Sequence, residues 1–236
     1  MIKEAIEKIE AMAAIQEFEI NGKKYTSGGL VPVLEPQPTY LKIETLTGFQ
    51  DYISANIDNM AIPGGHLVHV ENHLEVSLIS RMAEAFKQRA TYIRASASPV
   101  KFPFGQFMDV ESFIIRMQSM FVQDETTATI LKIVGNVGDG VIRNFADDGV
   151  TQQATVKTGV SRVDNIPVPN PVELAPYRTF LEIEQPKSRF VFRMRSGAES
   201  PVCALFEADG GAWINEAIIR IREWLKDRVG GIAIIA

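Results

Sequence analysis

The stretch RTFLEIEQPKSRFVFRMRSGAESPVCALFEAD, residues 178–209, decides the fold. It contains three runs in which polar and apolar residues alternate, and this period of two is typical of β-strands. We predict strands at 178–184, 189–195 and 202–209, joined by short turns. The sequence therefore predicts an antiparallel three-stranded meander near the C-terminus.

The alternation also predicts how these strands align. The loop 185–188 places Glu184 opposite Arg189, and matching apolar faces then sets the third strand. One face becomes apolar, with Ile183, Phe190 and Phe206 in one row, Leu181, Phe192 and Ala204 in the next, and Thr179, Met194 and Val202 in the last. On the opposite face Arg189 lies between Glu184 and Glu207, a ladder that stabilises the pairing by about 1 kcal/mol.

The far end of the polar face carries arginines with no carboxylate among the strands. This register puts Arg178 opposite Arg195, with Arg193 one step along, and like charges across strands destabilise a sheet. One interpretation is that the arginines extend into water or pair with carboxylates elsewhere. The other is an anion site in which guanidinium groups bind phosphate or carboxylate, with Tyr177 adding a ring or a hydroxyl. The candidate ligand-binding residues are Arg178, Arg193, Arg195 and Tyr177.

A helix is predicted after the meander. Asp209 is a suitable N-cap, and the apolar face of the helix should cover the sheet with Trp213, Ala217, Ile221, Trp224 and Leu225. At the other end of the chain, residues 2–14 have helical amphipathic spacing through Ile2, Ile6, Ile9 and Ala13. Asn21-Gly22 between β-type residues then predicts a hairpin.

These elements predict an α+β fold in which an antiparallel sheet has helices packed on one face, the meander and the closing helix forming its C-terminal part. A chain of 236 residues suits a single domain, 1–236, and lobes at 1–105 and 106–236 are the alternative subdivision. The net charge of −5 counts against a general nucleic-acid surface, although a local basic patch is compatible with it.

The sequence has no pattern for a membrane span or a signal peptide, so we expect a cytoplasmic protein without membrane association. The apolar tail GGIAIIA, residues 230–236, is too short to cross a bilayer. We expect it to be ordered against another subunit, which makes a homo-oligomer the expected state.

Motifs for a metal, a cofactor or catalysis are not evident. His66, His69 and His73 lie close together, but their spacing fits no standard ligand set, and whether they bind a metal stays open. The G-x-x-G-x-G run at 135–140 lacks the lysine of a P-loop and follows a helix rather than a strand. We predict no cofactor, no metal site and no catalytic residue.

The order of several segments resembles a known family. These are TLTGFQDYI (45–53), a hairpin, DVESFIIRMQSMF (109–121), a second helix with a glycine-rich exit, IPVPNPVEL (166–174), PYRTFLEIEQP (176–186), RFVFRMR (189–195) and a closing helix. This order is similar to that of the YfdQ-like family of phage and prophage proteins, over most of the chain. The resemblance implies a phage origin and a place in the cytoplasm of the infected bacterium. It implies no activity and no site residue.

Three function hypotheses follow. The first is a non-enzymatic phage accessory protein that binds an anionic, nucleotide-like ligand, which would allow it to sequester a host-defence signalling molecule. The second is an accessory factor in phage DNA replication or recombination that binds single-stranded DNA through the same arginines. The third is a structural or assembly protein that forms homo-oligomers through the charged sheet face and the apolar C-terminus. The sequence also leaves open whether the protein is an enzyme, which ligand it binds, what its oligomeric state is and whether the N-terminal half contributes to a site.

Overall fold

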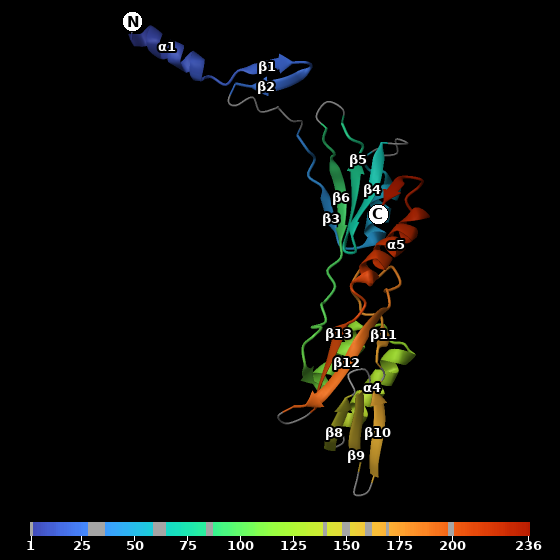
Figure 1. The fold of residues 1–236 in the computed structure, drawn as a ribbon. Helices are drawn as coiled ribbons and strands as arrows, with labels where there is room; N and C mark the ends of the chain where they lie inside the picture. The colour runs from blue at the N-terminus through green and yellow to red at the C-terminus, as the bar shows by residue number, and fades with distance from the viewer. Residues whose placement is uncertain are drawn as a thin grey trace.

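The computed structural model describes residues 2–27, 36–58, 65–83, 87–138, 141–147, 152–158, 162–168, 170–197 and 201–236. Over these ranges the chain combines helices with largely antiparallel sheets, so the predicted α+β class is confirmed. Figure 1 shows three parts in succession, which we name the arm (residues 2–27), the central lobe and the distal lobe. The central lobe is built on one sheet and the distal lobe on another.

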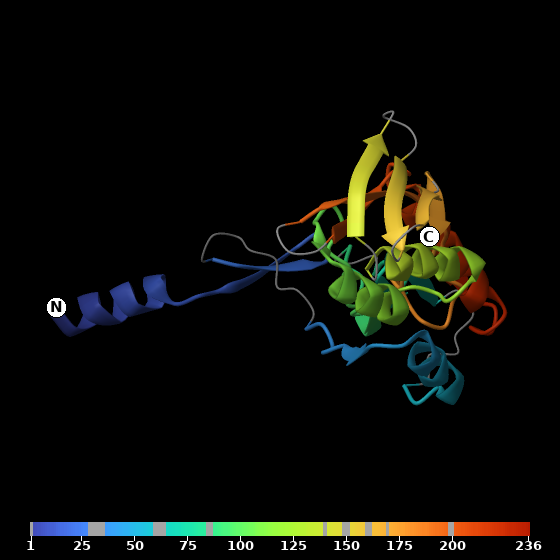
Figure 2. The ribbon, with the colours of Figure 1, turned by 90° about the horizontal axis from the view of Figure 1, so that it is seen from below.

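The arm contains one helix and one hairpin, as predicted: α1 (Ile2–Ala13), β1 (Glu17–Ile20) and β2 (Lys23–Thr26). The turn between the strands holds Asn21 at φ 52° and Gly22 at φ 75°. Two successive left-handed residues match the right-handed twist of a tight hairpin, and Asn-Gly adopts them with little strain. Figures 1 and 2 show the arm projecting away from the rest of the molecule.

The central lobe is a five-stranded sheet with the strand order β14-β4-β5-β6-β3. Its strands are β3 (Leu41–Ile43), β4 (His66–Asn72), β5 (Glu75–Ser80), β6 (Thr91–Ser96) and β14 (Ala233–Ile235). The apolar C-terminal tail thus forms β14, which pairs in parallel with β4 of its own chain. The tail is ordered, as expected, but its hydrogen-bonding partner in the described structure is β4 of the same chain; contact with another subunit stays a prediction.

Two helices, α2 (Leu46–Ala55) and α5 (Ala212–Lys226), cover one face of the central sheet. The core between these helices and the sheet consists of Leu46, Phe49, Val68, Val70, Val76, Leu78, Ile93, Ala95, Phe180, Ile183, Ile221, Leu225 and Val229. The closing helix was predicted correctly, but it packs on this sheet and not on the sheet formed by residues 188–207. Its N-cap is Gly211, and Asp209 instead accepts a hydrogen bond from the Gly211 amide at 3.0 Å.

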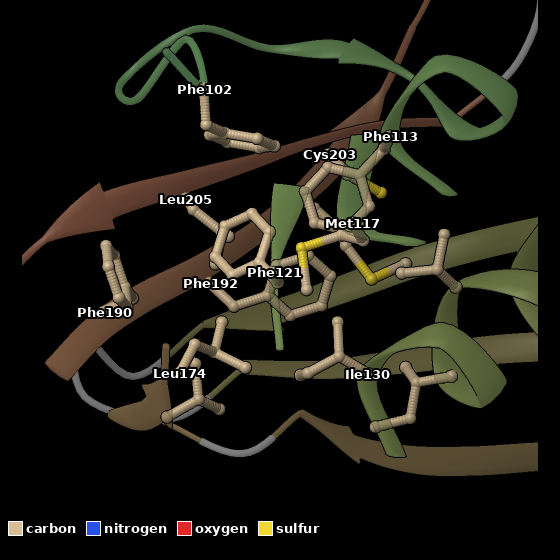
Figure 3. Close-up of a cluster of buried hydrophobic side chains, with 14 of the residues drawn as sticks. Phe102, Phe113, Met117, Phe121, Ile130, Leu174, Phe190, Phe192, Cys203 and Leu205 are labelled. Carbon is tan, nitrogen blue, oxygen red and sulfur yellow. The ribbon is translucent and has the colours of Figure 1, made fainter. Parts of the chain in front are cut away.

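The distal lobe has a four-stranded sheet of order β11-β12-β13-β7. Its elements are β7 (Met108–Asp109), α3 (Val110–Met120), α4 (Glu125–Gly138), β11 (Val172–Leu174), β12 (Ser188–Ser196) and β13 (Pro201–Glu207). Figure 3 shows its core, where Phe113 of α3, Phe121 at the end of α3 and Phe192 of β12 lie together, with Ile130 of α4 beside them. A separate three-stranded sheet, β8 (Val141–Asp147), β9 (Gln152–Thr158) and β10 (Arg162–Val168), extends from this lobe.

The chain passes from the central lobe to the distal lobe between Ala97 and Phe102 and returns to the central core with residues 177–187. It crosses to the distal lobe again for β12 and β13 and comes back to the central lobe with α5. The central core consequently takes in side chains from beyond residue 106, such as Phe180 and Ile221. The described chain thus has two hydrophobic cores that are interleaved in sequence.

The predicted meander is only partly correct. β12 and β13 are antiparallel strands, but residues 178–184 form turns rather than a strand. β11 occupies the position beside β12 instead. Pro171 and Pro176 flank β11, and such prolines are compatible with a short edge strand. The buried residues of the turn segment, Phe180 and Ile183, are three positions apart and pack in the central core.

The predicted register of β12 and β13 is wrong by one residue. Phe192 faces Leu205 and Met194 faces Cys203, whereas Ala204 and Phe206 lie on the opposite side of the sheet. The prediction failed because β13 is apolar on both faces, so its own pattern does not select one. Burial raises the pKa of the Cys203 thiol to about 12, in keeping with a packing role.

Candidate functional site

The Arg178 side chain is largely enclosed, at 10% exposure, where the two lobes meet. Its guanidinium donates to Glu207 Oε1 at 2.8 Å and to the Ser188 hydroxyl, and it lies 3.8 Å above the Trp213 ring. Burial lowers the pKa of Arg178 to about 10, and Glu207 opposes that shift, so the group stays charged at neutral pH. Arg178 therefore has a counter-charge that the sequence did not reveal, because Glu207 is distant along the chain.

His73 extends the same cluster from the β4–β5 turn. Its ring meets Trp213 edge-on at 4.8 Å, and its carbonyl accepts a hydrogen bond from Thr179. Burial, together with the charges of Arg178 and Lys101, lowers the pKa of His73 below its ordinary value. The cluster joins a hairpin of the central lobe to a strand of the distal lobe through an edge-on ring contact and the Arg178–Glu207 ion pair, in which Arg178 is largely enclosed and Glu207 is exposed.

The other two candidate arginines lie on β12, away from Arg178. Arg195 faces Val202 and stacks on Phe107 at 3.8 Å, and Arg193 faces Ala204. Because Val202 and Glu207 are five residues apart on β13, Arg195 and Arg178 are separated by about 16 Å along the strand. The predicted pairing of Arg178 with Arg195 is therefore wrong, since Arg178 does not belong to a strand of that sheet.

The predicted charge ladder is also rearranged. Arg189 faces Glu173 across β11 and β12, with Nε 3.5 Å from Oε1. Glu207 pairs with Arg178, and Glu184 pairs with Arg220 of α5 at 3.1 Å. The three carboxylates thus have three different arginine partners, because the segment that carries Glu184 leaves the sheet.

Tyr177 lines a different feature, a groove of about 740 Å³ between the lobes. Its walls carry exposed Val100 and Leu181, and its charged lining residues are Glu44 and Glu182. Glu182 also accepts a hydrogen bond from the Thr47 amide at the start of α2. With carboxylates as its charged groups, this groove is poorly suited to an anion.

A polar row crosses the central sheet on the face away from its core. Strand pairing aligns His69, Ser77, Arg94 and Lys42 across β4, β5, β6 and β3, and the apolar Ile235 of β14 completes the row at one edge. Arg94 pairs with Glu71 at 3.2 Å and donates to Ser77 at 3.1 Å. Tyr40 lies beneath both cations, with Arg94 5.2 Å and Lys42 5.6 Å from the ring centroid. Sequence reasoning missed this row because its members come from five separated strands.

The histidines do not assemble into a metal site in the described structure. His66 and His69 lie on β4 with an odd separation, so they point to opposite faces, and His73 lies in the turn beside Trp213. Among the described residues, no three His, Cys, Asp or Glu side chains are grouped closely enough to bind a metal ion.

The arm is the most exposed apolar feature. Of the fifteen large apolar side chains that are prominently exposed in the described residues, seven belong to the arm: Ile2, Ile6, Ile9, Met12, Ile15, Phe18 and Ile20. No residue of α1 is buried, although its isoleucines share one face. The sequence correctly predicted the amphipathic helix but not that its apolar face has no partner within the described chain.

Comparisons with protein-family models, with curated proteins and with solved structures find no match for this chain. None of its described helices combines the length and the apolar character needed to cross a membrane. The functional interpretation therefore depends on the geometry of the chain itself.

Proposed function

We propose that this chain is a structural assembly protein that forms homo-oligomers through its N-terminal arm. The observation that carries the proposal is the set of seven exposed large apolar side chains on an arm that projects away from both lobes in the described structure. The apolar C-terminus, which the sequence offered as a further contact, pairs with β4 of its own chain as β14, so the proposal rests on the arm.

The physics of short elements supports a partner for the arm. An isolated helix of 12 residues is marginal in water, and a two-stranded hairpin alone is also marginal. Burying one isoleucine side chain contributes about 2 kcal/mol, so association would stabilise both elements. The arm thus gains from a contact that the rest of the described chain does not provide.

The charges of α1 favour a protein partner over a lipid surface. The helix carries Lys3 and Lys8 against Glu4, Glu7 and Glu10, a net charge of −1. Helices that lie on anionic membranes are usually rich in lysine and arginine on the polar face. A second copy of this chain, which presents the same apolar stripe, is the occupant that we propose.

The test measures molecular mass in solution by light scattering over a range of concentrations. Ile9→Glu places a charge in the apolar stripe, so we expect it to convert the oligomer to a monomer. Ala11→Glu is the matched control, because it adds the same charge on the opposite side of α1 and should leave the mass unchanged. A wild-type monomer at all concentrations, or an oligomer that persists in Ile9→Glu, would refute the proposal.

A lipid partner has its own outcome in the same experiment. Co-sedimentation of the monomeric full chain with phosphatidylglycerol vesicles, lost in Ile9→Glu, would show that the stripe binds a membrane surface. That result would also overturn assembly through a second copy.

A second candidate function keeps the anionic ligand but moves it from the arginines of β12 to the polar row. The observation in its favour is the grouping of Lys42 and Arg94 around the Tyr40 ring, since cations beside an aromatic face suit a nucleotide or a single strand. Binding of a short oligothymidylate should weaken in Lys42→Ala and remain in Arg195→Ala. Equal binding by both variants and the wild type would exclude this location.

A further inference from the structure

We infer that two copies of α1 pair in antiparallel orientation, with Lys3 of each copy beside Glu10 of the other. This inference rests on the proposed assembly through the arm and specifies its geometry. It follows from the spacing of apolar residues along α1 and from which charges flank them.

The apolar residues of α1 have the spacing of a two-helix seam. Ile2, Ile6, Ile9 and Ala13 are separated by four, three and four residues, which is the alternation of d and a positions in a heptad repeat. All of these positions are exposed, so the seam is available to a partner. In an antiparallel pair Ile6 of one copy packs beside Ile9 of the other, twice, and the two isoleucine layers form the centre of the contact.

The flanking residues distinguish the two orientations. With Ile6 at position a, the e positions hold Lys3 and Glu10, and the g positions hold Ala5 and Met12. Parallel helices bring e beside g, which would leave both charges against apolar side chains. Antiparallel helices bring e beside e, so Lys3 meets Glu10 of the second copy at both ends, and Ala5 meets Met12. The charge pattern is therefore self-complementary in the antiparallel orientation alone.

The arrangement is consistent with what Lys3 does inside its own helix. Lys3 Nζ lies 3.9 Å from Glu7 Oε1, and both side chains are largely exposed. Such an exposed pair contributes little, so it does not prevent Lys3 from reaching across the seam. Glu7 lies at position b, outside the contact.

A charge-exchange experiment tests the orientation in the full-length protein. Lys3→Glu makes both e positions acidic, and Glu10→Lys makes both basic, so each variant alone repels its own copies. We expect each to weaken self-association about tenfold. An equimolar mixture of the two should recover wild-type mass, because every e position then meets an opposite charge. Lys8→Glu is the matched control, since it changes the same charge at position c.

The outcomes separate this inference from the proposed assembly. If Ile9→Glu abolishes the oligomer but the mixture of Lys3→Glu and Glu10→Lys associates no better than either variant alone, the antiparallel orientation is wrong and assembly through the stripe remains. If Ile9→Glu leaves the oligomer intact, the assembly itself is wrong.

Cysteine pairing gives an independent measurement of the orientation. A mixture of Ile6→Cys and Ile9→Cys should form an intermolecular disulfide under mild oxidation, while each variant alone should not, because like positions are apart in an antiparallel seam. A parallel pair would give the reverse, with Ile6→Cys cross-linking to itself. Cys203 is buried and does not compete.

Discussion

The arm and the two lobes are built from the same kinds of residue but differ in where their apolar side chains lie. Phe192 in the distal lobe and Leu225 in the central lobe are fully buried, whereas Ile9 in the arm is 65% exposed. Each lobe surrounds a core with a sheet and two helices, but the arm has only one helix and two strands and encloses nothing. Amphipathic patterning therefore shows that a surface needs covering and leaves open whether the same chain covers it.

The two ends of the chain show the same difference between covered and exposed apolar side chains. Both carry apolar side chains, yet β14 near the C-terminus pairs with β4, whereas no residue of α1 near the N-terminus is buried in the described structure. We therefore expect variants in the lobes to change the free energy of unfolding and variants in the arm to change the mass in solution.

The largest expected effect is in the distal core. Phe192→Ala removes a ring that lies 5.5 Å from Phe113 and should reduce the free energy of unfolding by about 3–5 kcal/mol. Urea denaturation followed by circular dichroism measures it. Leu181→Ala is the control, because its side chain is 74% exposed and its loss should cost far less. Under conditions in which Phe192→Ala is still folded, its mass in solution should equal that of the wild type. A folded but monomeric variant would show that self-association depends on the distal core as well as on the arm.

The next effect concerns the junction between the lobes. Arg178→Ala removes the largely enclosed partner of Glu207 and the cation above Trp213, and should cost about 1.5–3 kcal/mol. Arg195→Ala, which removes an exposed cation stacked on Phe107, should cost under about 1 kcal/mol in the same denaturation assay. Equal losses for the two arginines would mean that burial at the junction does not stabilise the chain.

Local signals made much of this fold predictable. Asn21-Gly22 specifies its hairpin within four residues, and Asp109 caps α3 by accepting from the Ser112 amide at 2.8 Å. The failures are tertiary. Residues 178–184 alternate like a strand, but Phe180 and Ile183 are needed in a core that lies elsewhere in sequence. The sequence of this segment alone does not show that two of its side chains pack in a distant core.

The candidate site was less predictable than the fold. The pairing of Arg178 with Glu207 spans 29 positions and depends on a turn segment that sequence reasoning took for a strand. The polar row forms only because β3 and β14 pair in parallel at the two edges of the central sheet, and no local sequence pattern predicts those pairings. By contrast, the stripe of α1 was visible in the spacing, because a helix face depends only on residues within three turns.

Acid should weaken the lobes through His73. Its pKa is lowered in the folded chain, so below about pH 6.5 the unfolded chain binds a proton that the folded chain resists. Stability is thus fully present above that pH and falls as the pH drops below it. Urea midpoints at pH 7.5 and 5.5 measure the loss, which should shrink in His73→Gln. The arm contains no histidine, so we expect the same mass in solution at both pH values. If the urea midpoint of His73→Gln fell between pH 7.5 and 5.5 as much as that of the wild type, this role of His73 would be contradicted.

The smallest expected effect lies in the arm's own turn. Gly22 has φ 75°, and a side chain there is strained even though no atom lies within 4 Å of its added Cβ, so Gly22→Val should destabilise the hairpin by about 1–2 kcal/mol. Asn21→Asp is the control, because Asp-Gly also adopts this turn. Since the hairpin packs on neither lobe, urea midpoints should not move, while light scattering should show weaker association in Gly22→Val than in Asn21→Asp. A shifted urea midpoint of Gly22→Val with an unchanged mass in solution would contradict this prediction. The arm would then stabilise its own chain and take no part in self-association.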